Sequence, residues 1–136
     1  MLDLGAGSGL VAIAAALAGA GAVLASEIDP LAHAAIRLNA QANGVSIAIL
    51  GDVLGGAGED AAVVLAADVW YERHLAARTA DLLVRAAARG SHILAADVGR
   101  AFLPKDLFRA IASYEVPVIA DLEDADVKRV RILTLA

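Results

Sequence analysis

The chain has 136 residues, which suits one domain with a single core and is short for two, and 60% of its residues are apolar. It contains no cysteine, so disulfides, thiolate zinc sites and cysteine nucleophiles are excluded. The formal net charge is −5 and no basic cluster stands out, which argues against nucleic acid as a main ligand. The N-terminus lacks the basic start of a secretory signal. We therefore expect one domain over residues 1–136 in a cytoplasmic protein.

The first feature is a glycine-rich turn between a short apolar strand and a helix. It carries alternate glycines that begin two residues after an acid, namely Asp3, Gly5, Gly7 and Gly9. Glycine is needed where the backbone takes a positive φ or where a ligand approaches it closely, and a helix N-terminus favours negative charge. A dinucleotide fingerprint requires glycine where this chain has Leu10, which disfavours a nicotinamide dinucleotide oxidoreductase.

Beyond the turn, apolar runs and turn residues alternate along the chain. They predict strands at residues 1–4, 22–26, 45–50, 61–67 and 92–96, and helices at residues 8–18, 30–42, about 72–89 and 105–112. Asp29 and Pro30 are typical of a helix start, and Asn43 with Gly44 of a helix end. Residues 54–60 indicate a loop. The alternation predicts a Rossmann-like α/β fold, with a doubly wound and mostly parallel sheet between two helical layers.

The C-terminal part of the chain changes character. Residues 114–120 and 127–135 predict two strands joined by the acidic stretch 121–126, a spacing that indicates an antiparallel pair. Pro117 has no backbone N–H, so its strand is expected at a sheet edge. The antiparallel pair further disfavours the oxidoreductase.

One uncharged stretch, residues 4–26, has about the length of a transmembrane helix, roughly 20 residues. It contains five glycines, and much of the remainder is alanine, which is only weakly lipophilic. A strand, turn, helix, turn and strand explain it better, so we expect no membrane interaction.

A glycine or an acid follows each of five successive predicted strands: the glycine turn, Glu27, Asp52, Asp68 and Asp97. In open α/β sheets, ligands bind at the carboxyl ends of the strands, near the point where the strand order reverses. We therefore expect these residues to form one rim. Glu27 stands about 20 residues after the turn, where an acid reaches the two ribose hydroxyls of a nucleotide; a solvated strand end is the alternative.

The spacing acid-x-G-x-G-x-G resembles motif I of the class I, or seven-β-strand, S-adenosylmethionine-dependent methyltransferases. Asp68-Val69-Trp70-Tyr71 resembles the D-x-[FWY]-Y stretch of the protein lysine methyltransferases among them. Further stretches at residues 37–45, 99–101, 114–117 and 122–129 extend the likeness over nearly the whole chain. The branch is the bacterial one related to the electron transfer flavoprotein β-subunit lysine methyltransferase, also described as nicotinamide N-methyltransferase-like or ribosomal protein L11 methyltransferase-like. The resemblance implies the strand order 3-2-1-4-5-7-6, in which the sixth strand is an edge.

The resemblance also implies S-adenosylmethionine as the cofactor and S-adenosylhomocysteine as the product. The implied cofactor-binding residues are Asp3, Gly5, Ala6, Gly7, Gly9, Glu27, Ile28, Asp52, Val53 and Asp68. Glu27 would hold the ribose, Asp52 would accept from the adenine N6 amine, and Asp3 would help to hold the methionine ammonium, directly or through water. A plain Gly-Asp turn is the alternative for Asp52. An unpaired carboxylate beside a buried strand would be costly, which indicates a partner for Asp3.

The implied reaction is methyl transfer to an amine, first of all the lysine side chain of a protein substrate. An in-line displacement needs alignment and a shielded path, and the amine must be neutral although free lysine has a pKa of about 10.4. Asp68 would orient the amine, and Trp70 and Tyr71 would wall the channel. Packing of both rings on the next helix is the alternative.

Four remaining polar residues are less informative. Arg100 either touches the substrate or pairs with an acid, and the sequence does not decide between them. The histidines show no metal-ligand spacing, so we expect structural roles for them and no metal site: His33, His74 and His92.

Two other functions stay open beside a protein lysine methyltransferase. A small amine such as nicotinamide is a second candidate acceptor, and a module that binds the cofactor or a partner without catalysis is a third possibility. Relatives carry a substantial segment before motif I, whereas Met1 stands two residues before Asp3. We therefore expect this chain to be the cofactor-binding core of a longer protein. The sequence does not specify the oligomeric state.

Overall fold

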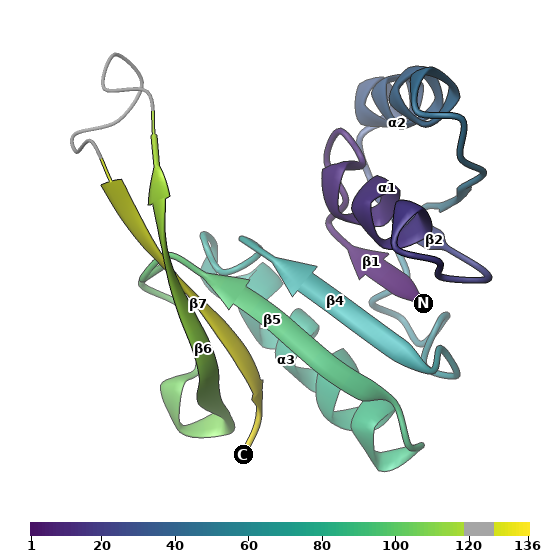
Figure 1. Ribbon diagram of the computed structural model, residues 1–136. Helices are drawn as coiled ribbons and strands as arrows, with labels where there is room; N and C mark the ends of the chain where they lie inside the picture. Colours follow the sequence, from purple (N-terminus) through teal and green to yellow (C-terminus); the bar gives the residue numbers. More distant parts are fainter. Residues whose placement is uncertain (119–126) are drawn as a thin grey trace.

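One seven-stranded sheet organises the computed structural model, which describes residues 1–118 and 127–136 (Figure 1). The strand order is β3-β2-β1-β4-β5-β7-β6, the order that the resemblance implied. The strands are β1 (Leu2–Leu4), β2 (Leu24–Ser26), β3 (Ala48–Leu50), β4 (Val63–Ala67), β5 (His92–Asp97), β6 (Phe108–Pro117) and β7 (Val127–Leu135). The helices in the described residues are α1 (Leu10–Leu17), α2 (Pro30–Ala42), α3 (Arg73–Ala88) and the short 3-10 turn η1 (Lys105–Leu107).

The first five strands are parallel, and the last two run antiparallel to their neighbours. β1 pairs with β2 on one side and with β4 on the other, so the strand order reverses at β1. β7 pairs antiparallel with both β5 and β6, and β6 is the edge strand, as expected from Pro117. The predicted α/β fold with its antiparallel C-terminal pair is confirmed.

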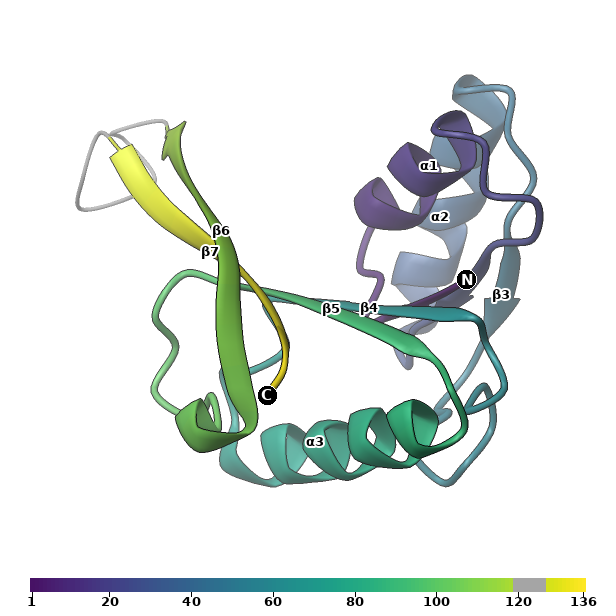
Figure 2. The same cartoon turned by 60° about the horizontal axis from the view of Figure 1, so that its bottom comes forward.

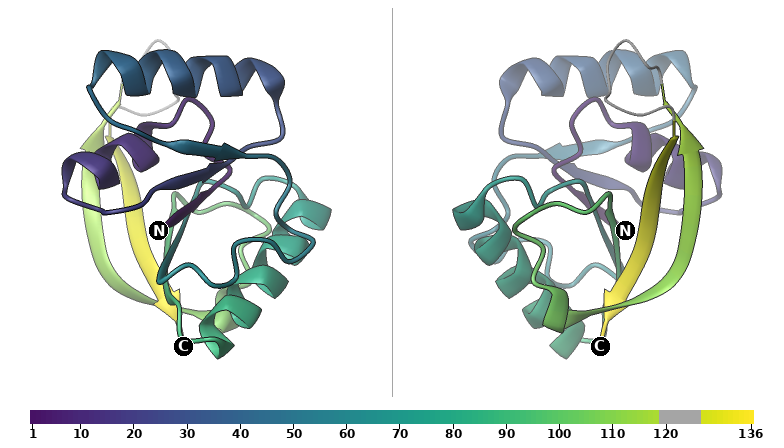
Figure 3. Two further views of the ribbon diagram at one scale, coloured as in Figure 1. Left: turned by 90° about the vertical axis from the view of Figure 1, so that its right-hand side faces the viewer. Right: turned by 90° about the vertical axis from the view of Figure 1, so that its left-hand side faces the viewer.

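The helices cover opposite faces of the sheet. Figure 2 shows α1 and α2 on one face and α3 on the other, and Figure 3 shows α2 and α3 on opposite sides of the strands. The larger core cluster lies between the strands and α3 and includes Leu2, Val64, Leu82 and Leu83. A smaller cluster, containing Ala12, Ala25 and Ile36, lies under α1 and α2.

Helix ends follow the expected local chemistry. Asp29 is the N-cap of α2 and accepts a hydrogen bond from Leu31 N–H at 2.8 Å, and Pro30 opens the helix. Gly44, with φ 67°, directly follows the C-cap residue Asn43. Glu72 caps α3 by accepting from His74 N–H. The stretch from residue 54 to residue 60 has turns and no helix, as expected.

The helix predicted at residues 105–112 is wrong. Only η1 is helical there, and residues from Phe108 onward join β6, which begins six residues before the strand predicted at 114. Local spacing allowed both conformations, and pairing with the full length of β7 decides in favour of the strand. Phe108 also packs edge-to-face on Trp70, with ring centroids 5.4 Å apart. The ladder shifts register between Ala110 and Ala112.

Most of the other strands are shorter than predicted, by one to three residues. The expected acidic connection at 121–126, and the last residues of the strand predicted to reach 120, lie outside the described residues. None of the helices in the described ranges has the length and apolar character that crossing a bilayer requires.

Candidate functional site

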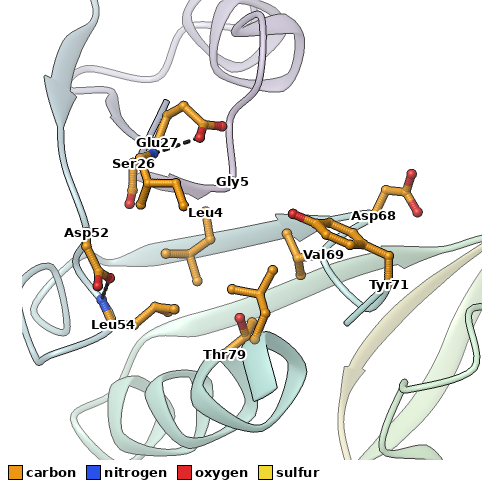
Figure 4. Close-up of a pocket in the computed structure, with 12 residues that line it drawn as sticks. Leu4, Gly5, Ser26, Glu27, Asp52, Leu54, Asp68, Val69, Tyr71 and Thr79 are labelled. Carbon is orange, nitrogen blue, oxygen red and sulfur yellow. Dashed lines mark hydrogen bonds between the residues drawn. The ribbon is translucent and has the colours of Figure 1, made fainter. Parts of the chain in front are cut away.

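A cleft opens at the carboxyl ends of β1, β2 and β4, beside the point where the strand order reverses (Figure 4). The open space in this cleft is about 560 Å³, including solvent at its mouth. The lining residues are Leu4, Gly5, Ser26, Glu27, Ile28, Asp52, Leu54, Asp68, Val69, Tyr71, Leu75 and Thr79. Acids therefore stand around a largely apolar floor.

The glycine turn forms one wall, and its backbone requires glycine. Gly5, Gly7 and Gly9 have φ of 66°, 53° and 88°, in the region that side chains avoid. A Cβ on Gly5 would lie 2.8 Å from Val69 Cγ1, so the turn also packs tightly against the end of β4. A Cβ on Gly7 would meet nothing within 4 Å, so at that position only the positive φ calls for glycine.

Glu27 ties the glycine turn to the end of β2. Its Oε2 accepts from Gly7 N–H at 2.9 Å, and its Oε1 accepts from Ile28 N–H at 2.7 Å and Asp29 N–H at 3.1 Å. His33 Nε2, from α2, donates to the Glu27 carbonyl oxygen at 2.7 Å. The carboxylate is thus fixed at the cleft wall (Figure 4).

Asp52 follows β3 and stands at another end of the cleft. Its Oδ1 accepts from Leu54 N–H at 2.9 Å, and its Oδ2 pairs with Arg78 of α3 at 2.9 Å. The hydrogen bond from Arg78, supported by the one from Leu54, holds the pKa of the Asp52 carboxyl below its usual value. Asp52 is therefore an ionised acceptor.

Asp3 lies below the turn and does not line the cleft. Its side chain is buried, and its Oδ2 accepts from Ala12 N–H in the first turn of α1 at 3.0 Å. Burial raises the pKa of the Asp3 carboxyl to about 6, the Ala12 bond opposes this shift and the Glu27 charge adds to it. The partner expected for Asp3 is thus found within the protein, at a helix N-terminus that favours an anion.

Asp68 ends β4 with a backbone that few residues adopt. Its φ is 54°, the only positive value for a non-glycine residue among those described. Its carboxylate forms a bidentate pair with Arg100, with Nε–Oδ1 at 2.6 Å and Nη2–Oδ2 at 2.7 Å. Of the two roles left open for Arg100, pairing with an acid is therefore what the structure shows.

The two aromatic residues after Asp68 separate. Tyr71 is exposed and lies along the cleft, between Asp68 and the floor (Figure 4). Trp70 is fully buried and packs on Phe108, and its ring does not line the cleft. Its Nε1 has no hydrogen-bond partner among the described residues. Trp70 is therefore a core residue whose ring packs on β6, whereas the alternative given above was packing of both rings on the next helix. A channel wall stays a prediction for Tyr71 alone.

The predicted residues divide into those in the cleft and those that support it. Gly5, Glu27, Ile28, Asp52, Asp68 and Tyr71 line it, whereas Asp3, Ala6, Gly7, Gly9, Val53 and Trp70 are not among its lining residues. Sequence reasoning missed the other six lining residues, namely Leu4, Ser26, Leu54, Val69, Leu75 and Thr79. The last two lie on α3, and Thr79 is buried. Both belong to the apolar face of an ordinary amphipathic helix, which carries no signal of a site.

Metal ligands are not grouped in the part of the chain that the structure describes: no three His, Asp or Glu side chains come together there. Asp97, the last member of the expected rim, is buried and accepts hydrogen bonds from Gly99 and Arg100 N–H. It therefore shapes the loop that carries Arg100 and does not open to the cleft.

Comparison of the sequence with known proteins identifies the family of this chain. The sequence matches the model of the ribosomal protein L11 methyltransferase (PrmA) family over residues 1–94. The chain belongs to this family. An electron transfer flavoprotein beta subunit lysine methyltransferase of Xenopus laevis is 36% identical over 104 residues, which are 74% of this chain and 42% of the relative. The chain thus spans about two fifths of that relative's length.

Solved structures show the same fold. A ribosomal protein L11 methylase of Lactobacillus delbrueckii superposes with a TM-score of 0.68 at 21% identity, covering 98% of this chain and 68% of that one. A putative tRNA (m1A22) methyltransferase of Streptococcus pneumoniae, in complex with S-adenosyl-L-methionine, gives 0.68 at 16% identity, with coverages of 99% and 65%. These likenesses confirm the seven-stranded methyltransferase fold of this PrmA-family chain.

Proposed function

We propose that this chain is the core of an S-adenosylmethionine-dependent N-methyltransferase whose acceptor is an amine, namely the lysine side chain of a protein. One observation carries the proposal. The glycine turn, Glu27, Asp52 and Asp68 meet in a single cleft at the reversal of strand order. Membership of the PrmA family supports the same chemistry.

The residues of the cleft fit the cofactor. Glu27 presents a carboxylate held by three backbone N–H groups, suited to accept from the two hydroxyls of a ribose. Asp52 is an acceptor that matches the adenine N6 amine, and the apolar side chains of Leu54 and Leu75 can flank the base. Asp3 already bonds Ala12 N–H beneath the turn, so we infer that it reaches a methionine ammonium through water.

The cofactor supplies an electrophilic methyl group on a sulfonium. The chain's own residues align the acceptor and limit access of water, because an in-line displacement gains most from fixed geometry. Asp68 accepts an N–H from the amine and directs the nitrogen lone pair into the cleft. The Tyr71 ring shields the path beside it. The amine must arrive without its proton.

Two features support a protein acceptor. The Asp68 and Tyr71 end of the cleft is open, with 53% of the Asp68 side chain and 62% of Tyr71 exposed, so that a side chain on a large substrate can reach it. The Xenopus laevis relative is named for methylation of a protein lysine. A small amine also fits an open cleft and is the second candidate. We propose a cytoplasmic location and no nucleic-acid substrate.

The test is methyl transfer from radiolabelled S-adenosylmethionine. The acceptors are ribosomal protein L11, the electron transfer flavoprotein β subunit and nicotinamide, with Asp68→Asn as the control variant. Labelled lysine that is lost in Asp68→Asn supports the proposal. Labelled nicotinamide with unlabelled proteins would assign the small-amine function. Cofactor binding without transfer to any amine would indicate a binding module.

A further inference from the structure

The pair between Asp68 and Arg100 stands at the acceptor end of the cleft, and it occupies both oxygens of the carboxylate. Arg100 lies in the loop after β5, 32 residues from Asp68 along the chain. The two contacts of 2.6 and 2.7 Å form a planar fork, the geometry in which arginine binds carboxylates most strongly.

The backbone around each residue of this pair is constrained. Asp68 has its left-handed φ of 54°, which turns the chain sharply at the end of β4. On the other side, buried Asp97 accepts from Gly99 N–H at 2.8 Å and from Arg100 N–H at 3.0 Å, and Gly99 has φ 100°. Arg131 of β7 pairs with the same Asp97 at 2.7 Å. The position of Arg100 is thus fixed from β5 and β7.

An ordinary surface pair in the same protein shows the contrast. Glu115 and Arg129 face each other across β6 and β7 with a single contact of 3.4 Å, and about 70% of each side chain is exposed. Such pairs contribute little to stability. The Asp68–Arg100 pair is shorter, bidentate and built on two constrained loops.

The charge of Asp68 matters for an amine acceptor. A bare carboxylate beside an amine raises the amine's pKa and keeps it as an ammonium ion, which has no lone pair to attack with. A guanidinium on the same carboxylate offsets its field but leaves lone pairs free to accept an N–H. Among the residues that line the cleft, the other charged ones are Glu27 and Asp52, and Asp52 pairs with Arg78. Behind the loop, Asp97 pairs with Arg131.

We propose that Arg100 is a positioning residue that neutralises Asp68, so that this carboxylate orients a neutral amine without retaining an ammonium ion. The inference rests on the proposed function, because it takes the acceptor to be an amine at Asp68. It assigns a role to a residue that lies outside the lining of the cleft.

The test measures ammonium binding in the absence of cofactor, so that its outcome does not depend on cofactor binding. The isotope-labelled chain is titrated with n-butylammonium, a mimic of the lysine side chain that is fully charged near pH 7, and the amide signals of residues 68–71 are followed by NMR. The wild type should bind it weakly. Arg100→Gln should bind about fivefold more tightly, the range of one exposed ion pair.

Matched variants separate this role from a structural one. Arg100→Lys retains the charge and should stay near the wild type. Combining Arg100→Gln with Asp68→Asn should abolish the gain, and asparagine tolerates the left-handed backbone at 68, so this variant should fold. An Arg100→Gln chain that is folded but binds n-butylammonium no better than the wild type would overturn the inference. A failure of S-adenosylhomocysteine to bind would count against the proposed function and not against this pair.

Discussion

Glu27 closes the glycine turn by accepting a hydrogen bond from Gly7 N–H at 2.9 Å, across 20 residues of sequence. This contact links the end of β2 to the turn that follows β1, and it holds the carboxylate at the cleft wall. The two elements that the sequence marks most clearly are therefore joined directly.

The Gly7 amide reports this link in solution. In Glu27→Ala the amide loses its acceptor, and its hydrogen exchange should become about tenfold faster, the value of one hydrogen bond of about 1.4 kcal/mol. NMR-detected exchange measures it. The Ala12 amide, which bonds Asp3, is an internal control and should keep its rate. Equal acceleration of both amides would point to general loosening of the fold.

Gly5 and Gly7 form a matched pair for stability. Both have positive φ, so alanine at either position costs about 1–2 kcal/mol of unfolding free energy. At Gly5 the new Cβ also meets Val69 Cγ1 at 2.8 Å, whereas at Gly7 it meets nothing within 4 Å. Urea unfolding should therefore show Gly5→Ala to be less stable than Gly7→Ala by at least about 1 kcal/mol. Equal losses would mean that the turn does not pack on β4 as described.

Asp3 should make stability fall as the pH rises. Its pKa is raised from 3.8 to about 6 in the folded chain, so the native state binds the extra proton between these values. The stabilisation is complete below pH 4 and is lost as the pH passes 6, a change of about 3 kcal/mol. Asp3→Asn removes the titration and can still accept from Ala12 N–H.

The measurement is the difference in unfolding free energy between the wild type and Asp3→Asn over this pH range. Groups such as Asp52 and Glu59, whose pKa values are lowered, contribute alike to both chains and cancel. The wild type should lose stability relative to the variant as the pH rises. A difference that does not vary with pH would contradict the raised pKa.

Asp52 should make the chain bind a ligand with an adenine base more tightly than the same ligand with the 6-oxo base hypoxanthine. Its ionised carboxylate can accept from the N6 amine of S-adenosylhomocysteine but not from the O6 of S-inosylhomocysteine. The wild type should prefer the first ligand, and Asp52→Asn, whose amide can donate to O6, should reduce the preference about tenfold. Competition binding with both ligands measures the ratio. An unchanged ratio in Asp52→Asn would show that the base lies elsewhere.

Much of the fold follows from local patterns in the sequence. The alternation of apolar runs with capped helices predicts the parallel half of the sheet, and Asp29 caps its helix as expected. The region around residues 105–112 could not be read in this way, because its helical spacing is outweighed by β6–β7 pairing and by the contact of Phe108 with Trp70. Such long-range terms leave no periodicity in the sequence.

The candidate site likewise combines residues that local patterns predict with residues that only long-range contacts bring in. Glycines and acids at strand ends mark the cleft because their residue types and positions are unusual. The sequence does not indicate which arginine pairs with which acid, since Arg78 and Arg100 reach Asp52 and Asp68 from 26 and 32 residues away. Thr79 reaches the cleft only because α3 packs beneath β4. Partners of this kind depend on the assembled fold.

The most direct measurement of the central claim is calorimetric titration of the chain with S-adenosylhomocysteine, with NAD as the comparison ligand and Glu27→Ala as the control variant. We expect binding in the micromolar range that is lost in Glu27→Ala, and no binding of NAD. A folded chain that binds NAD, or that binds S-adenosylhomocysteine equally well without the Glu27 carboxylate, would contradict the account.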